Sequence, residues 1–363
     1  MKKSIDKVFL LSVIMLTVAG FLVFSSASLG LLARDGASFQ TVALKQTVSL
    51  LIGIVVFFAM SRVNYKYIGK YAFYIFLFSI FLNLLLFIPS LTQSHGGAGR
   101  WIDLGFITFQ PSEFMKIAFV IYFSAWLAGV KDRVKTFSLG ILPYIIIIGA
   151  LSTLLIAQSD TDTLIVIAGT GIIMLFSAGA KIRHLILLGI FLFILVGTIA
   201  YTRPYVWQRI TTFLSPNQDV QGSGYQIRQS LIAIGSGQLS GRGFGQSVQK
   251  FNYLPEPIGD SIFAVQAAEF GFAGSIVLIL LFLLFLFRSF KIGARSPSVF
   301  GGLTAIGIAI LIIIESFMNI ASMLGIIPLS GMPLLFISHG GTALIITLGA
   351  AGIIANISKH RKT

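Results

Sequence analysis

Ten long apolar runs occupy most of this sequence and decide what it can fold into. A transmembrane helix needs roughly 20 mainly apolar residues. A soluble chain of 363 residues cannot bury so much apolar surface, because 56% of the residues are hydrophobic and the mean hydropathy is +0.93. We therefore predict an all-α integral membrane protein with ten transmembrane helices. The runs are 8–29, 46–62, 71–90, 113–129, 139–157, 161–178, 183–201, 262–287, 299–324 and 338–357.

The basic residues predict the orientation in the membrane. Lys and Arg outnumber Asp and Glu by 26 to 12, which gives a net charge of +14. Counting alternate loops from the N-terminus places 17 of the 26 on one side and eight on the other, with Lys116 inside a run. Cytoplasmic loops carry the excess of Lys and Arg, so both termini are predicted to be cytoplasmic. The positive charge then favours contact with anionic membrane lipids, and no nucleic-acid partner is predicted.

The acidic residues gather on the other side. Only Asp6 and Asp132 fall on the predicted cytoplasmic side, and the remaining acids lie outside or within the runs. Any chemistry is therefore expected at the outer face. The sequence has no Cys, which excludes disulfides and thiolate metal sites.

No linker interrupts the chain, and residues 1–363 are predicted to form a single polytopic membrane domain. The outer loops are short except for 91–112 and a large extracytoplasmic loop at about 202–261, between the seventh and eighth helices. Within that loop, residues 225–234 carry apolar side chains at helical spacing, which predicts a short amphipathic helix near the outer interface.

The segment GAGRWIDLGFITFQPSEFMK, residues 97–116, leads into the fourth run. Ser112 is a candidate N-cap. Glu113 and Lys116 lie three apart, so they share a helical face and are expected to pair. This pattern fits a capped helix end with a salt bridge. It also fits a polar site, because a lysine inside a membrane segment is costly unless it is paired or faces a wet cavity.

Two other polar segments admit both a structural and a functional interpretation. In QSDTDT, residues 158–163, Asp160 is either a helix cap or part of a site. The glycine-rich GSGQLSGRGFGQSVQK, residues 235–250, lacks the Gly-Lys-Ser/Thr ending of a nucleotide P-loop. It is either a flexible loop or, with Arg242 and Lys250, an anion site for a lipid-linked phosphate.

The segment LPEPIGDSIFAVQAAEFG, residues 254–271, holds three scarce carboxylates at the start of the eighth run. Asp260 is either an N-cap or an outward-facing acid or base. Glu269 lies nine residues further on, about 13 Å along a helix, and is expected to be paired inside the bundle. Glu315 and Asn319 form a second polar patch, interpreted as structural. Residues 326–344, broken by prolines and glycines, are predicted to form a re-entrant or cavity-lining segment.

These segments, in this order, resemble the SEDS family (shape, elongation, division and sporulation proteins). The resemblance rests on GAGRW…FQPSEFMK, GYQIRQSLIAIGSG, YLPEPIGDSIFAVQAAEFG and GMPLLFISHGG, and it covers nearly the whole chain. It implies a ten-helix peptidoglycan glycosyltransferase of the bacterial cytoplasmic (inner) membrane, which polymerises glycan strands from lipid II on the outer face. GRGFGQSVQKFNYLPE is more similar to FtsW, the division member, than to RodA, the elongation member.

The resemblance also implies roles for individual residues. Asp260 corresponds to the catalytic carboxylate and would act as general base in an inverting transfer, in which a leaving diphosphate needs positive charge. The candidate cations are Arg100, Lys116, Arg209, Arg242 and Lys250, with Glu113 holding Lys116. Trp101, Asp160, Gln229 and Glu256 complete the predicted substrate-binding residues. No cofactor is assigned, although a divalent cation (Mg²⁺ or Mn²⁺) would suit the diphosphate.

The implied partners are lipid II, a class B penicillin-binding protein, membrane lipids and other divisome or elongasome proteins. A lipid II flippase and a RodA-type elongation polymerase are the alternatives. The chain departs from the family pattern at several positions: Ile258 and Gly259 replace His and Thr, Ser159 replaces Pro, Asp162 replaces Gly and His339 replaces Tyr.

Overall fold

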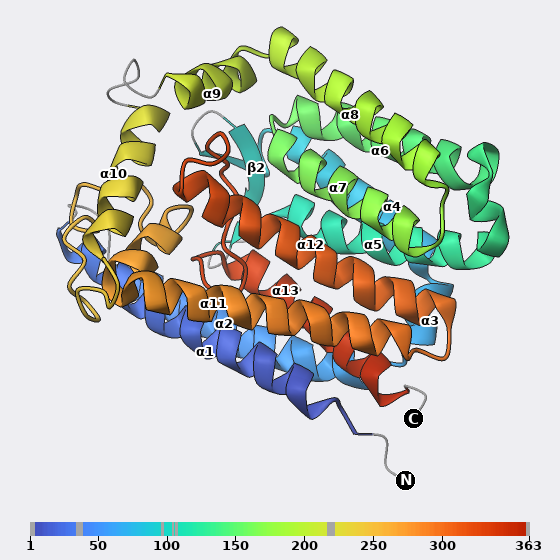
Figure 1. Ribbon diagram of the computed structural model, residues 1–363, viewed down its shortest axis with the longest axis horizontal. Helices are drawn as coiled ribbons and strands as arrows, with labels where there is room; N and C mark the ends of the chain where they lie inside the picture. The colour runs from blue at the N-terminus through green and yellow to red at the C-terminus, as the bar shows by residue number, and fades with distance from the viewer. Residues whose placement is uncertain are drawn as a thin grey trace.

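The computed structural model describes residues 4–33, 39–95, 98–103, 105, 108–215 and 222–360, and in these parts the chain is mostly helical (Figure 1). Each of the ten predicted runs contains a helix. The helices are α1 Lys7–Ser28, α2 Phe39–Arg62, α3 Tyr65–Lys70, α4 Ala72–Leu84, α5 Pro111–Val130, α6 Leu142–Ala157, α7 Thr161–Ser177, α8 Ile182–Thr202, α9 Pro204–Leu214, α10 Ser223–Ser236, α11 Ile262–Ala294, α12 Val299–Met323 and α13 Gly341–Lys359.

Eight of the described helical segments are long and apolar enough to cross a membrane. Two further apolar helices, Ala72–Phe87 and Thr161–Ser177, are shorter and coincide with the third and sixth predicted runs. The all-α membrane class is therefore confirmed, whereas the count of ten membrane-spanning helices stays a prediction.

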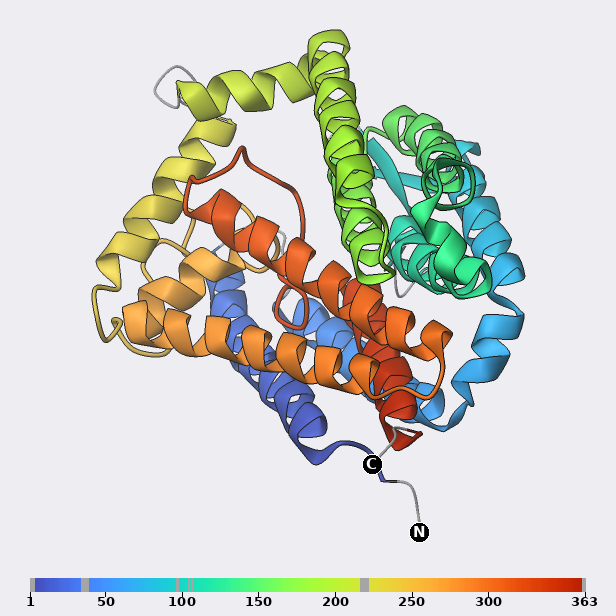
Figure 2. The ribbon, with the colours of Figure 1, turned by 45° about the vertical axis from the view of Figure 1, so that its right-hand side comes forward.

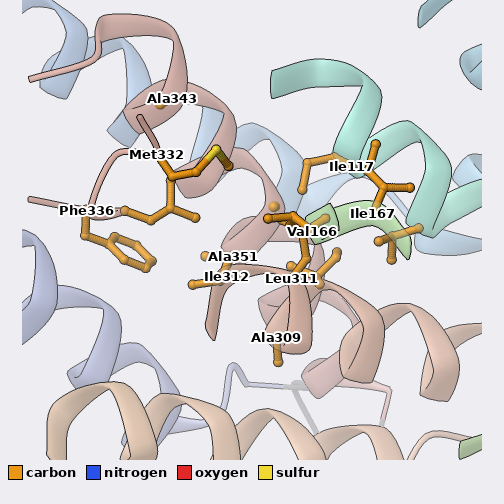
Figure 3. Packing of buried hydrophobic residues seen from close by; sticks show 14 of the residues in the cluster. Ile117, Val166, Ile167, Ala309, Leu311, Ile312, Met332, Phe336, Ala343 and Ala351 are labelled. Carbon is orange, nitrogen blue, oxygen red and sulfur yellow. The ribbon is translucent and has the colours of Figure 1, made fainter. Parts of the chain in front are cut away.

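The centre of the bundle is formed by α5, α12 and α13, which bury most of their side chains against other helices. Figure 3 shows Ile117 of α5, Val166 and Ile167 of α7, and Leu311 and Ile312 of α12 packed together. In contrast, α8 is the least buried of the long helices; it runs along the outer edge of the bundle in Figure 1, and its end next to α9 projects from the bundle in Figure 2. The interior is thus a close-packed interface of α5, α7, α12 and α13.

Close packing between α2 and α13 depends on a small residue. A Cβ atom added at Gly352 of α13 would lie 2.5 Å from the carbonyl oxygen of Phe57 in α2, far inside van der Waals contact. Membrane helices associate through such close backbone approaches, because lipid gives no hydrophobic drive to bring them together.

The two ends of the chain lie at one end of the bundle, and α9 and α10 lie at the other (Figure 1). The Asp6 N–H donates to Ser358 Oγ at 3.0 Å, and Arg288 forms two hydrogen bonds with the Asp6 carboxylate. This arrangement agrees with the prediction that both termini are on the same side of the membrane. The cytoplasmic location of that side stays a prediction.

The fourth helix begins two residues earlier than the predicted cap suggests. Helix α5 starts at Pro111, with Gln110 in the N-cap position and no side-chain cap. Proline suits the first helical position because its missing N–H would be unpaired there. Ser112 therefore lies inside the first turn and accepts a hydrogen bond from Gln110 Nε2 at 3.1 Å, so its predicted role as N-cap is wrong.

The large loop at 202–261 contains more helix than the sequence pattern predicts. Helix α10 confirms the expected amphipathic helix and extends it at both ends. Helix α9, begun by Pro204 at its first position, was not predicted. The other long outer loop holds a small antiparallel sheet of β1 Thr92–His95, β2 Ala98–Asp103 and β3 Thr108–Phe109, in which Ile102 pairs with Thr92 and Phe109.

The glycine-rich segment 237–250 docks onto a break in α11. Gly271 has left-handed backbone angles (φ 64°), and a Cβ added there would lie 2.3 Å from the Gly241 nitrogen. Main-chain hydrogen bonds hold the segment in place, including Gly243 N–H to Glu269 O at 3.0 Å and Phe272 N–H to Gln238 O at 2.8 Å. The glycines therefore serve close backbone approach, as only this residue fits there.

Candidate active site

Asp260 lies in a tight turn just before α11. Glu256 adopts a left-handed conformation (φ 45°), and its carbonyl oxygen accepts hydrogen bonds from the N–H groups of Gly259 and Ser261. The helix begins at Ile262 with Ser261 as N-cap and no side-chain cap bond. The hypothesis that Asp260 caps this helix is therefore wrong. Within the described residues its carboxylate forms no hydrogen bond or ion pair.

Two buried side chains hold the backbone around Asp260. Asn319 of α12 donates from Nδ2 to the carbonyl oxygens of Asp260 at 2.7 Å and of Met332 at 2.8 Å. Ser338 Oγ donates to the carbonyl oxygen of Gly259 at 2.9 Å. The turn is thus fixed to α12 and to the segment 324–340, although the carboxylate itself stays unpaired.

Arg209 and Asp162 form an ion pair beside this carboxylate. Arg209 Nη1 of α9 lies 2.8 Å from Asp162 Oδ2 in the first turn of α7. The same oxygen accepts a hydrogen bond from the Gly331 N–H at 3.4 Å. A Cβ added at Gly331 would lie 3.5 Å from Asp260 Oδ2 and 3.9 Å from Arg209 Nη2, so Gly331 lies against both side chains.

The surroundings of Asp260 favour its neutral form. Burial, followed by the nearby carboxylates of Glu256 and Asp162, raises the pKa of this carboxyl from its usual value of 3.8 to about 7. The guanidinium groups of Arg209 and Arg100 act in the opposite direction. A carboxyl with a pKa near neutrality suits a general base, because it accepts a proton readily and is still substantially ionised at pH 7.

Arg100, Trp101 and Asp160 lie around the turn between α6 and α7. Arg100 in β2 donates hydrogen bonds to the carbonyl oxygens of Gln158 and Ser159, and Trp101 is the next residue of the strand. Asp160 caps α7, accepting from the Thr163 N–H at 3.4 Å and from Thr163 Oγ1 at 3.0 Å. The cap interpretation of Asp160 is therefore confirmed.

A cavity of about 380 Å³ opens beside the Arg209–Asp162 pair. Its walls come from α7, α8, α9, α12 and residues 327–330, so the first part of the segment 326–344 lines a cavity as predicted. Apolar side chains form most of the surface, and Asp162 and Arg209 are the two charged residues in it. The lining of the cavity is thus mainly apolar, and its two charged residues lie next to Gly331.

Lys116 is enclosed by two carboxylates in the bundle interior. Its Nζ atom lies 2.8 Å from Glu113 Oε1, as their spacing predicts, and 2.5 Å from Glu315 Oε1 of α12. All three side chains are at most 4% exposed. Lys116 does not line the cavity, and its charge is already balanced.

Lys250 is also buried and paired with a carboxylate. Its Nζ atom lies 2.7 Å from Glu269 Oε1 and 2.9 Å from Ser26 Oγ of α1, and it is 0% exposed. The expectation that Glu269 is paired inside the bundle is confirmed. Ser26 Oγ and the Ser247 N–H also donate to this carboxylate, so the cluster ties segment 237–261 to α1 and α11.

Arg242 and Gln229 lie outside this group, unlike Glu256. Arg242 is exposed and donates from Nε to the Ser236 carbonyl oxygen at 3.2 Å, while Gln229 is half-buried on α10. Glu256 is exposed in the Asp260 turn. Asp162 and Gly331 belong to the site although neither is among the predicted site residues. One sequence signal could have pointed to Asp162 as a site residue: it is a second carboxylate, two residues after the cap Asp160, in the first turn of α7.

The described residues contain no group of three or more His, Asp or Glu side chains placed to hold a metal ion. A divalent cation on the diphosphate of a substrate stays a prediction.

Comparison with known proteins identifies the family. A family model described as "Cell cycle protein", of the FtsW/RodA/SpoVE type, matches residues 6–363. A probable peptidoglycan glycosyltransferase FtsW of Geobacter sp. (strain M18) is 36% identical, over 98% of this chain and 97% of its own. Stage V sporulation protein E of Bacillus subtilis (strain 168) is 35% identical, over 97% and 96% of the two chains.

Solved structures share the fold. A chain of a peptidoglycan synthase complex superposes with a TM-score of 0.81 at 24% identity, over 98% of this chain and 97% of its own. The crystal structure of the rod shape determining protein RodA from Thermus thermophilus gives a TM-score of 0.71 at 25% identity, over 99% and 98% of the two chains. The family model spans nearly the whole sequence and the relatives match it end to end, so this chain belongs to the FtsW/RodA/SpoVE family.

Proposed function

We propose that this protein is a peptidoglycan glycosyltransferase that polymerises glycan strands from lipid II, with Asp260 as general base. The observation that carries the proposal is the unpaired Asp260 carboxylate, whose burial raises its pKa to about 7, beside the Arg209 guanidinium. The names of its FtsW relatives support the same activity. Their naming also favours a role in cell division over the elongation role of a RodA-type polymerase.

The chemistry needs one base and one site for an anion. Asp260 takes the proton of the acceptor sugar's C4 hydroxyl while that oxygen attacks C1 of the donor sugar. The bond between C1 and the diphosphate oxygen breaks, and the diphosphate leaves as an anion, so direct displacement turns an α-linkage into a β-1,4 bond. The leaving group needs positive charge and no proton.

Among the predicted cations, Arg209 is best placed to meet that anion. It is 27% exposed, lines the cavity and lies next to Gly331 and Asp260. Arg100 acts on Asp260 from β2. Lys116 and Lys250 already neutralise buried carboxylates, and we assign them a structural role. The apolar cavity suits part of a polyprenyl chain, with its diphosphate at the charged end.

The protein works, in this proposal, in the bacterial cytoplasmic membrane with both termini in the cytoplasm and Asp260 on the outer face. The excess of Lys and Arg in the loops on the side of the termini supports this orientation. A cytoplasmic reporter such as green fluorescent protein, fused to the C-terminus, should fluoresce, and a fusion to alkaline phosphatase should be inactive. The opposite result would contradict the orientation.

We further propose a class B penicillin-binding protein as partner, together with other divisome proteins. The fold match to a chain of a peptidoglycan synthase complex supports this choice. A Mg²⁺ or Mn²⁺ ion on the donor diphosphate would share the neutralisation of charge with Arg209.

The experiment that tests the function uses purified protein in detergent with labelled lipid II, alone and with its penicillin-binding partner. A polymerase makes long glycan strands without any membrane to cross. A flippase makes none, but moves labelled lipid II across the bilayer of proteoliposomes. Folded protein that forms no polymer under either condition, yet transports lipid II, would overturn the proposal.

A further inference from the structure

One carboxylate oxygen joins three segments at the edge of the candidate active site. Asp162 Oδ2 of α7 binds Arg209 Nη1 of α9 at 2.8 Å and the Gly331 N–H at 3.4 Å. The side chain of Asp162 is 10% exposed, and that of Arg209 is 27% exposed. A charge-assisted contact of this geometry, largely shielded from water, fixes the direction in which the guanidinium points.

Arg209 has two carboxylates within reach and pairs with one of them. Asp260 Oδ2 and Arg209 Nη2 both lie against Gly331, within 4 Å of the same added Cβ position. Nevertheless Asp260 has no ion-pair partner among the described residues, whereas Asp162 does. Asp162 binds the Nη1 atom of Arg209, and the Nη2 atom of the same guanidinium faces Gly331.

We propose that Asp162 is a positioning residue: by binding the Arg209 guanidinium it keeps this cation off the Asp260 carboxylate. Asp260 then stays free to accept a proton, and the Nη2 edge of Arg209 stays free for the diphosphate of the donor. Asp162 is also a position at which this chain departs from the motif it resembles, where the family has Gly. The inference rests on the proposed function for the role of Asp260.

The charges around Asp260 show why this position of Arg209 matters. Glu256 from its own turn and Asp162 from α7 raise the pKa of Asp260, while Arg209 from α9 and Arg100 from β2 lower it. A direct ion pair with an arginine lowers a carboxyl pKa by about 1–3 units. Release of Arg209 onto Asp260 would therefore weaken the base and occupy the cation that the leaving group needs.

The cavity supports the second half of the proposal. Its charged end is formed by Asp162 and Arg209, and the rest of its lining is apolar apart from Thr161 and Ser330. A diphosphate attached to an apolar chain would meet Arg209 on entering this end. If Arg209 were paired with Asp260 instead, the anion would first have to break that ion pair.

The test measures the ionisation of Asp260 directly, by the pH dependence of its labelling with a carbodiimide, which reacts with protonated carboxyl groups. The purified full chain is labelled in detergent, and peptide mass spectrometry then gives the pH at which half of Asp260 is labelled, the labelling midpoint. We expect about pH 7 for the parent protein, and a midpoint lower by about 1 unit or more for Asp162→Asn. Arg209→Gln should raise the midpoint. In the double variant, Asp162→Asn with Arg209→Gln, the labelling midpoint should return close to the parent value, because no guanidinium is then present to pair with Asp260.

The pH profile of lipid II polymerisation is measured on the same samples and should shift with the labelling midpoint. Asp162→Asn should also raise the KM for lipid II, because the diphosphate then competes with Asp260 for Arg209. Asp132→Asn, an exposed carboxylate just beyond the end of α5, is the matched control and should change neither midpoint nor KM.

Two results would overturn the inference. One is a parent-like midpoint and KM for folded Asp162→Asn, which would leave Asp162 a merely structural residue. The other is an equal downward shift in the single and double variants, which would show that Asp162 acts on Asp260 without Arg209. If the parent protein labels as expected but makes no polymer, the proposed function fails, while the arrangement of the three side chains stands.

Discussion

Asn319 and Asp260 are joined by a hydrogen bond in which the buried amide of Asn319 donates to the main-chain carbonyl oxygen of Asp260 across 2.7 Å. The same amide donates to the carbonyl oxygen of Met332 at 2.8 Å. One side chain of α12 therefore fixes the turn that carries the proposed base relative to the segment that lines the cavity.

Replacing Asn319 by Leu should lower both stability and turnover. Each buried carbonyl left without a donor costs about 1–3 kcal/mol, so the thermal midpoint in detergent should fall. A displacement of Asp260 by about 1 Å is enough to reduce catalysis by about 10²-fold. The rate of lipid II polymerisation per folded molecule should therefore drop at least tenfold.

Asn356→Leu is the matched control for this prediction. Asn356 is also buried, and it bridges the Ser61 carbonyl oxygen and the Tyr65 N–H near the chain termini. It should lose a comparable amount of stability but keep its turnover. Equal losses of turnover in the two variants would show that Asn319 matters only for folding.

Replacing Asp260 by Asn should abolish most of the polymerisation while leaving the fold intact. The carboxylate forms no hydrogen bond or ion pair among the described residues, so its loss should hardly change the thermal midpoint. Removal of a general base lowers the rate by about 10²–10⁴-fold, and lipid II binding should stay close to that of the parent.

Glu256→Gln serves as the control for this substitution, because Glu256 is exposed in the same turn. It should keep most of the activity. If Asp260→Asn polymerises lipid II at the parent rate and Glu256→Gln does not, then Glu256 is the base.

The rate of polymerisation should fall on the acid side of neutrality. The base acts in its ionised form, and burial, followed by the carboxylates of Glu256 and Asp162, raises the pKa of Asp260 to about 7. Below that pH the ionised fraction decreases about tenfold per unit. Initial rates between pH 5.5 and 8.5 with saturating lipid II should show this slope, and a flat profile from pH 6 to pH 8 would contradict the assignment.

The buried Lys250–Glu269 pair should be structural. Lys250→Met leaves the Glu269 carboxylate buried without a cation, which typically costs about 3–5 kcal/mol. Thermal denaturation of the detergent-solubilised protein should show a large loss of stability.

The double variant Lys250→Met with Glu269→Gln removes both charges, while the Gln side chain can still bind Ser26. It should recover a large share of the stability and, with it, of the polymerisation rate. Recovery of stability without any recovery of activity would instead support Lys250 as a ligand of the diphosphate.

Local patterns in the sequence accounted for the features that depend on near neighbours. The apolar runs became helices because a membrane segment must satisfy its own backbone hydrogen bonds. The spacing of Glu113 and Lys116 correctly predicted a pair on one helical face, and Asp160 caps α7 as its position suggests. The amphipathic pattern at 225–234 became part of α10. Each of these outcomes follows from periodicities of a few residues.

The tertiary structure alone decided which polar groups meet. Lys116 pairs with Glu315 across 199 residues of sequence, Asn319 binds the Asp260 carbonyl across 59, and Arg209 binds Asp162 across 47. The same applies to Lys250, which points into the bundle towards Glu269 rather than out towards a phosphate. Spacing cannot predict such pairs, because they depend on how the helices pack and on the path of the loops between them. The sequence therefore determined a membrane-embedded helical protein with a carboxylate at the mouth of α11, and the packing of α7, α9, α12 and the segment 324–340 decided that this carboxylate stays unpaired beside an arginine.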